Sequence, residues 1–215
     1  TYESILKRVR KAYHGLVAEW LIQHSEERIW EYTGLIADHL ELAGKTEQAT
    51  IYLYQAGERA ANRYANDEAL RYFTRALALT PEDDLAGHFD LLLAREGVLN
   101  LIGDRVAQER DLNSLKQIAE SIGDVRRQAD TALRRMIYLV ETSNFAEAEE
   151  SATDAISLAQ AAIDLHCEAK VNLHWGRSLW HHGKSVQAIS RLETALHLTQ
   201  AHHFQEIEAE VFRNL

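Results

Sequence analysis

The chain has 215 residues and a formal net charge of −10, with 46% hydrophobic and 26% charged residues. This composition is that of a protein with a sizeable core, and its acidity argues against nucleic-acid binding unless basic residues gather on one face. A single cysteine excludes an internal disulfide and suits a reducing cytoplasm, and no apolar run approaches the length of a membrane span.

One proline and ten glycines are too few for a fold of strands and hairpins, which needs frequent turn residues. Long runs rich in alanine, leucine, glutamate, glutamine and arginine favour helices, and apolar residues recur at three- and four-residue steps. We predict helices over residues 4–24, 27–43, 47–64, 67–79, 85–102, 105–121, 125–142, 145–162, 165–182, 185–202 and 205–215.

The first two helices lie within residues 1–43, which we expect to link to an upstream domain. The basic run from Leu6 to Lys11 is most simply a solvated face. Because the sequence begins without methionine and stops within a predicted helix, we interpret it as a piece of a longer protein. Its last helix lacks a partner, which predicts weak self-association through that end.

The link Ala65 to Ala69 supplies a helix N-cap in Asn66 or Asp67. The acids Glu82 to Asp84 follow Pro81 at a junction between helices. Acidic residues are favoured at helix starts, so we interpret these as a polar loop and not as a catalytic acid–base pair.

The second half of the sequence aligns with itself at a spacing of forty residues. The aligned apolar columns are Leu99, Leu139 and Leu179; Leu93, Leu133 and Leu173; Ile118, Leu158 and Leu198; and Ala129, Ala169 and Ala209. One helix pair cannot hide its apolar face, whereas stacked pairs bury a continuous core. We therefore predict an all-α right-handed superhelix (an α-solenoid) of antiparallel helix pairs. Its repeats are residues 44–84, 85–124, 125–164, 165–204 and a truncated 205–215.

The unit over residues 165–204 resembles a tetratricopeptide repeat. The matching positions are Asn172, Trp175, Gly176, Leu179, Ala188, Leu192 and Ala195. Small residues at Gly176 and Ala188 suit a close helix crossing, and Gly183 permits a left-handed turn. The stretch "EALRYFTRALALTP" also fits a second repeat helix, and the resemblance covers roughly residues 33 to 215.

Two stretches imitate the end of a phosphate-binding loop, Gly44-Lys45-Thr46 and Gly183-Lys184-Ser185. Such a loop needs another glycine five positions before its second glycine, where this chain has His39 and Ser178. Both stretches are therefore predicted to be ordinary turns.

Seven of the eleven histidines fall between His166 and His203. His174 and His181 are about two helical turns apart, too far to converge on one zinc ion. We favour a surface-exposed, compositional origin over a weak metal or pH-sensing role. Neither a G-x-S-x-G nor an HExxH motif is present, so we predict a protein that is not an enzyme and has no cofactor.

First helices of stacked pairs line the concave groove of the superhelix, where we expect a protein or peptide to bind. The groove-facing positions are Lys170, Arg177, Trp180, His181, Asp130, Ile137, Val140 and Glu141. Trp180 is the best single candidate, because exposed aromatic residues beside arginine are common binding anchors. The alternative is that Trp180 packs against the neighbouring helix pair.

Several segments resemble the region after the ATPase core of large multidomain bacterial signalling ATPases. They are "YESIL", "IADHLELAG", "YLYQAGERA" and "YANDEALRYFTRAL", and "FDLLLAREGVLNLIGD" is similar to repeats of their tails. The resemblance implies a cytoplasmic, non-catalytic interaction and sensor region that regulates an upstream ATPase domain of the parent chain. The ATP site would lie upstream.

Two other functions remain open. One is a free-standing tetratricopeptide scaffold or co-chaperone, which predicts a basic groove for acidic peptide tails. The other is small-ligand sensing in the groove, as in maltose-responsive transcription activators with similar repeat tails, which the fluorescence of Trp175 and Trp180 could test.

Overall fold

The structure is a computed structural model that describes residues 6–214, apart from the side chain of Glu27. These residues form α-helices, one short 3-10 helix and no strand, so the all-α prediction is confirmed for them. The elements are α1 (Lys7–His24), η2 (Glu26–Arg28), α2 (Ile29–Ala43), α3 (Thr46–Asn62), α4 (Asn66–Leu79), α5 (Leu85–Ile102), α6 (Arg105–Ile122), α7 (Val125–Glu141), α8 (Phe145–Ala161), α9 (Leu165–His181), α10 (Ser185–His202) and α11 (Gln205–Phe212).

The helix bounds lie within a few residues of those predicted. The first predicted helix begins at residue 4, and residues 4 and 5 lie outside the described residues. Residue 215, the predicted end of the last helix, lies outside them too. The last helix ends earlier than predicted, at Phe212. No helix among residues 6–214 combines the length and the apolar character that crossing a bilayer demands.

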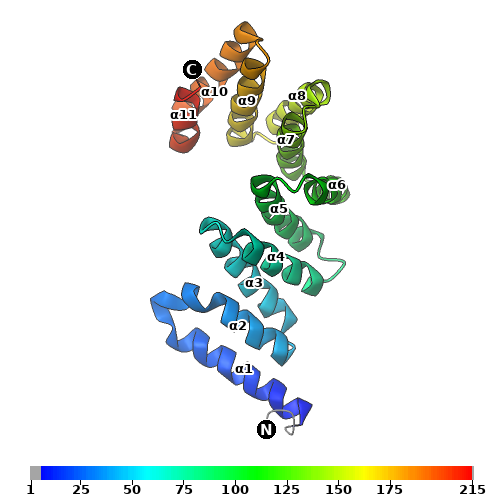
Figure 1. The fold of residues 1–215 in the computed structure, drawn as a ribbon, viewed down its shortest axis with the longest axis vertical. Helices are drawn as coiled ribbons and strands as arrows, with labels where there is room; N and C mark the ends of the chain where they lie inside the picture. The colour runs from blue at the N-terminus through cyan, green and yellow to red at the C-terminus, as the bar shows by residue number, and fades with distance from the viewer. Residues whose placement is uncertain (1–5, 215) are drawn as a thin grey trace. The chain divides into compact units, whose positions relative to one another are not determined.

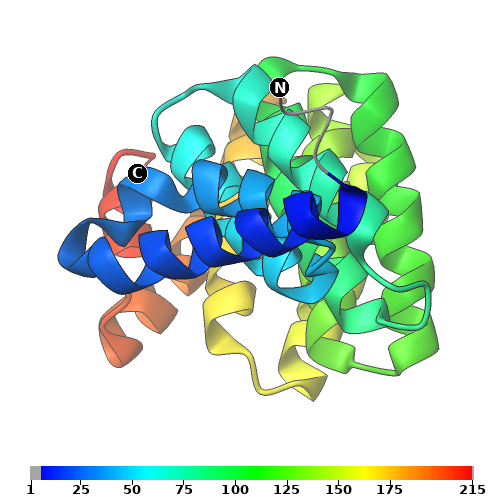
Figure 2. The same ribbon diagram turned by 90° about the horizontal axis from the view of Figure 1, so that it is seen from below.

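The chain divides into two compact units, and the first, Thr1–Asp104, contains α1 to α5. Each helix of this unit packs against the next one, and α3 also contacts α5. Figures 1 and 2 both show α1 alongside α2, with a tight link between them. This is the neighbour-to-neighbour packing that a helical repeat requires.

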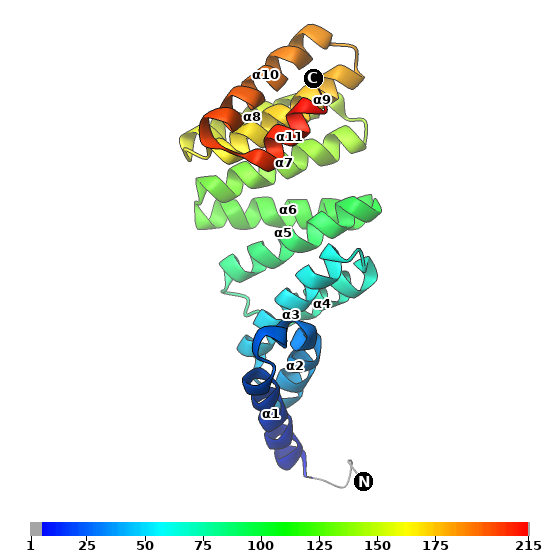
Figure 3. The same cartoon turned by 90° about the vertical axis from the view of Figure 1, so that its left-hand side faces the viewer.

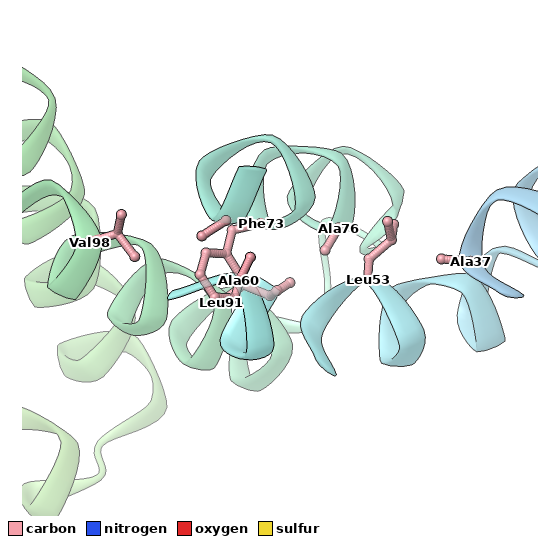
Figure 4. Close-up of a cluster of buried hydrophobic side chains, with 8 residues drawn as sticks. Ala37, Leu53, Ala60, Phe73, Ala76, Leu91 and Val98 are labelled. Atoms are coloured by element: carbon pink, nitrogen blue, oxygen red, sulfur yellow. The ribbon is translucent and has the colours of Figure 1, made fainter. Parts of the chain in front are cut away.

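Small and large side chains alternate in the core of the first unit. Figure 4 shows Phe73 and Leu53 packed among alanines that come from several helices. Gly57 lets α3 approach this core closely, because a Cβ atom there would lie 2.5 Å from the Phe73 ring. A second cluster joins the first two helices to α3 through Ala18, Leu21, Ile36, Leu40 and Ala49.

The second unit, Arg105–Leu215, contains α6 to α11. Here too each of α7 to α11 packs against its neighbour, and α9 also contacts both α7 and α11, the helices next but one. Figure 3 shows these helices in successive layers within the unit. Buried residues of α9, α10 and α11 form one cluster, made of Ala169, Leu173, Leu192, Ala195, Ile207 and Val211.

Left-handed residues end many of the helices. Gly44, Gly103, Gly123 and Gly183 have φ between 72° and 76°, which glycine adopts without strain. The predicted left-handed turn at Gly183 is confirmed, and the backbone N–H of the next residue, Lys184, donates to the carbonyl of Leu179 at 3.0 Å. Four other helix ends place Tyr64, Ser143, Ile163 or His203 in this conformation instead.

Aspartates cap the starts of three helices. The side chains of Asp84, Asp124 and Asp164 accept backbone N–H bonds from the first turns of α5, α7 and α9. This confirms helix-start acids after Pro81. The predicted cap at Asn66 or Asp67 is wrong, because Ala65 occupies the cap position and Asn66 Oδ1 is buried without a hydrogen-bond partner.

Candidate functional site

The predicted site lies on α7 and α9, which contact each other within the second unit. Their inner sides are fixed by the aligned leucines of the sequence repeat, since Leu133, Leu139, Leu173 and Leu179 are all at most 4% exposed. Their remaining side chains form the surface that we name the α7/α9 face.

The predicted residues differ in exposure. Arg177, His181 and Glu141 are exposed, and Lys170, Asp130, Ile137 and Val140 are half-buried. Trp180, near the end of α9, is 54% exposed. About half of this side chain is therefore available for contact.

The structure brings only some of these residues together. Lys170 lies close enough to Asp130 to favour its ionised form, although burial, the largest effect, raises the pKa of Asp130. Glu141 instead meets Arg105 of α6, with 3.4 Å between Oε2 and the guanidinium nitrogen. The predicted site residues thus make separate local charge contacts along two helices and do not all converge on one point.

His174 is the most perturbed group on this face. Burial, and then the positive charges of Arg177, Lys170 and Arg134, lower its pKa to about 4. The expectation that the histidines are merely exposed is wrong for this residue, whose side chain is half-buried. We name Arg134, Lys170, His174 and Arg177 the His174 cluster. At neutral pH it carries three positive charges around a neutral imidazole.

The sequence reasoning missed Arg134 and His174 as parts of this face. The signal was available, because the two residues are forty apart and each lies four residues after a predicted site residue, Asp130 or Lys170. Residues four apart on a helix lie on the same side of it. Among the described residues, no group of three potential ligands converges on a metal position.

Asp164 fixes the start of α9. One of its oxygens accepts a hydrogen bond from the backbone N–H of Cys167 at 2.9 Å, and the other lies 3.4 Å from Arg126 Nε of α7. The Cys167 thiol is 2% exposed, and burial raises its pKa to about 12. This buried thiol is therefore a poor nucleophile at neutral pH.

A groove between α3 and α5 in the first unit was not foreseen. It has a volume of about 890 Å³ and includes the loop between α4 and α5. We name it the α3/α5 groove. Its lining residues are Thr46, Glu47, Thr50, Ile51, Tyr54, Gln55, Glu58, Leu79, Thr80, Pro81, Asp84, Gly87, Asp90 and Leu91.

No protein-family model matches the chain. Over 94 residues, 42% of its length, the chain is 31% identical to a protein of Rhizobium meliloti (strain 1021) that is described as uncharacterized. The matched part is 9% of that protein. The similarity is thus to a small part of a much longer chain, and it assigns no activity.

Proposed function

We propose that this chain is a non-catalytic interaction and sensor region that regulates a multidomain signalling ATPase. The α7/α9 face would bind a protein or peptide. The observation that carries this proposal is Trp180, an aromatic side chain that is 54% exposed on the same helix as exposed Arg177 and His181. Tryptophan and arginine are the residue types most enriched among the energetic centres of protein interfaces.

Three further observations support the finer assignment. Helices α5, α7, α9 and α11 begin at Leu85, Val125, Leu165 and Gln205, steps of forty residues that favour tetratricopeptide-like repeats in a right-handed superhelix. The similar stretch of the Rhizobium meliloti protein is 9% of that chain, as expected for a segment of a large multidomain protein. A free, buried Cys167 agrees with our expectation of a cytoplasmic location.

The test uses the full natural protein encoded by the gene. We expect a phosphate-loop ATPase upstream of these repeats, with an ATP hydrolysis rate that changes at least threefold in Trp180→Ala and in Arg177→Glu. Val186→Ala is the matched control, because Val186 is 84% exposed and belongs to α10, so it is not part of the α7/α9 face. A gene without an upstream ATPase, or equal rates in all variants, would refute the proposal.

A free-standing scaffold for acidic peptide tails is the second candidate, and the His174 cluster favours it. Arg134, Lys170 and Arg177 act on one imidazole, so three cations lie near one another. This function predicts that an acidic C-terminal peptide binds at low salt and is released at high salt. Arg134→Gln combined with Arg177→Gln should weaken such binding at least tenfold, as measured by fluorescence anisotropy.

A further inference from the structure

The α3/α5 groove combines a concave shape with an apolar floor. Ile51 is 54% exposed even though it lines the groove, and Leu91 of α5 and Pro81 of the preceding loop line it too. An exposed isoleucine inside a hollow is a place where an apolar side chain of a partner gains burial.

The charges around this floor all have one sign. Glu47, Glu58, Asp84 and Asp90 line the groove, and none of its described lining residues is a lysine, arginine or histidine. The other described hollow, about 480 Å³ among α6, α7 and α8, differs in this respect. It is lined by both Lys116 and Arg135 as well as by acids. The single sign is therefore a property of the α3/α5 groove and not of every hollow in this acidic chain.

The carboxylates are spread along the groove, and hydrogen bonds fix the positions of two of them, Glu58 and Asp84. Glu47 and Glu58 are eleven residues apart on α3, which corresponds to about 16 Å along the helix axis. Glu58 accepts a hydrogen bond from the Tyr54 hydroxyl at 3.1 Å, and Asp84 caps α5 through Gly87 N at 2.9 Å. Burial first, and then Glu58 and Asp90, raise the pKa of Tyr54 to about 12, so both carboxylates act on the same part of the groove.

We propose that the α3/α5 groove binds an extended segment of a partner protein in which basic residues flank an apolar side chain. An extended chain covers about 16 Å in about five residues. Lysines or arginines five residues apart can thus reach the carboxylates at both ends while an apolar residue between them packs on Ile51. This site lies in the first unit and is separate from the proposed α7/α9 face, so either can fail without the other.

The experiment measures fluorescence anisotropy of a fluorescein-labelled peptide with the core "KSLSLK", titrated with the full chain. We expect saturable binding that weakens severalfold between 50 and 300 mM salt, and no binding of the peptide "ESLSLE". Failure of the basic peptide to bind at millimolar protein, or equal binding of the acidic peptide, would overturn the proposal.

Matched variants separate this site from general attraction to an acidic protein. The double variant Glu47→Gln with Glu58→Gln should weaken peptide binding at least fivefold. The control double variant is Glu193→Gln with Glu206→Gln, at exposed positions of the second unit. It removes the same charge and should change peptide binding less than twofold. Ile51→Ser should weaken binding at least threefold, and Val186→Ser should not. If a control weakens binding as much as the groove variant does, the proposal is wrong.

Discussion

At Gly176, α9 approaches α10 closely, as the small residue at this repeat position predicts. A Cβ atom there would lie 2.8 Å from Leu192 Cγ and 3.2 Å from the Ala188 carbonyl oxygen. Leu192 is 1% exposed, so it cannot simply turn out into solvent. The requirement for glycine is therefore steric and comes from the neighbouring helix.

Gly176→Ala should destabilise the protein by about 1–2 kcal/mol, because overpacking outweighs the gain of about 1 kcal/mol in helix propensity. Gly15 of α1 is the matched control, since the nearest atom to a Cβ there is 3.7 Å away. Gly15→Ala should be neutral or stabilising by up to about 1 kcal/mol. Urea unfolding followed by tryptophan fluorescence measures both, and equal effects of the two substitutions would contradict this explanation.

Ile163 adopts an unfavourable backbone conformation at the end of α8. Its φ is 53°, in the left-handed region that β-branched residues rarely occupy, and its side chain is 79% exposed and so gains little from burial. Ile163→Gly should raise the free energy of unfolding by about 1 kcal/mol, because the relieved strain exceeds the added entropy of the unfolded chain. Ile163→Val keeps the branched Cβ and should leave stability unchanged. A loss of stability on introducing glycine in the same urea assay would show that strain is not released.

At the scale of helices, α7 and α9 place positive charges around a half-buried histidine. The folded state keeps the pKa of His174 near 4, below the ordinary value of 6.5. The unfolded chain therefore binds a proton more readily, and this histidine's contribution to stability is complete above about pH 6.5 and is lost as the pH falls toward 4.

Between pH 7 and pH 5 we expect His174 to account for a loss of about 1 kcal/mol of stability, less than the full pKa shift implies because part of the side chain remains in solvent. His174→Asn should flatten this part of the pH dependence of urea unfolding. His197→Asn, at an exposed position of α10, should not alter it. A pH dependence that survives in His174→Asn would assign the loss to other groups.

The helices and their turns could be predicted from the sequence because each depends on residues close along the chain. One-sided apolar periodicity predicts the helices, and Gly176 and Gly183 are identified by their positions in the repeat. The α3/α5 groove could not be predicted, since it depends on which helices meet after folding. The N-cap of α4 was also predicted wrongly, at Asn66 or Asp67 instead of Ala65, because the choice between adjacent positions depends on backbone angles that residue type alone does not determine.

At the scale of the whole molecule, the rate at which Cys167 reacts with a thiol reagent measures how often the second unit opens. It is the single cysteine of the chain, it is buried, and the pKa of its thiol is raised to about 12 from an ordinary value near 9. Three pKa units reduce the reactive thiolate about a thousandfold, and burial slows access further. A disulfide reagent such as dithiodipyridine should thus label the native protein at least a thousand times more slowly than the urea-unfolded chain. Equal rates would mean that α9 is open in the native state.

The contacts of each helix within a unit also bear on how the chain is made. The main partners of a helix are the next one along the sequence or the one after it. Closing such short loops costs little entropy, and topologies rich in local contacts fold rapidly. The first unit can therefore complete its core while the ribosome is still synthesising α9 to α11. Little apolar surface of the first unit then stays exposed during translation.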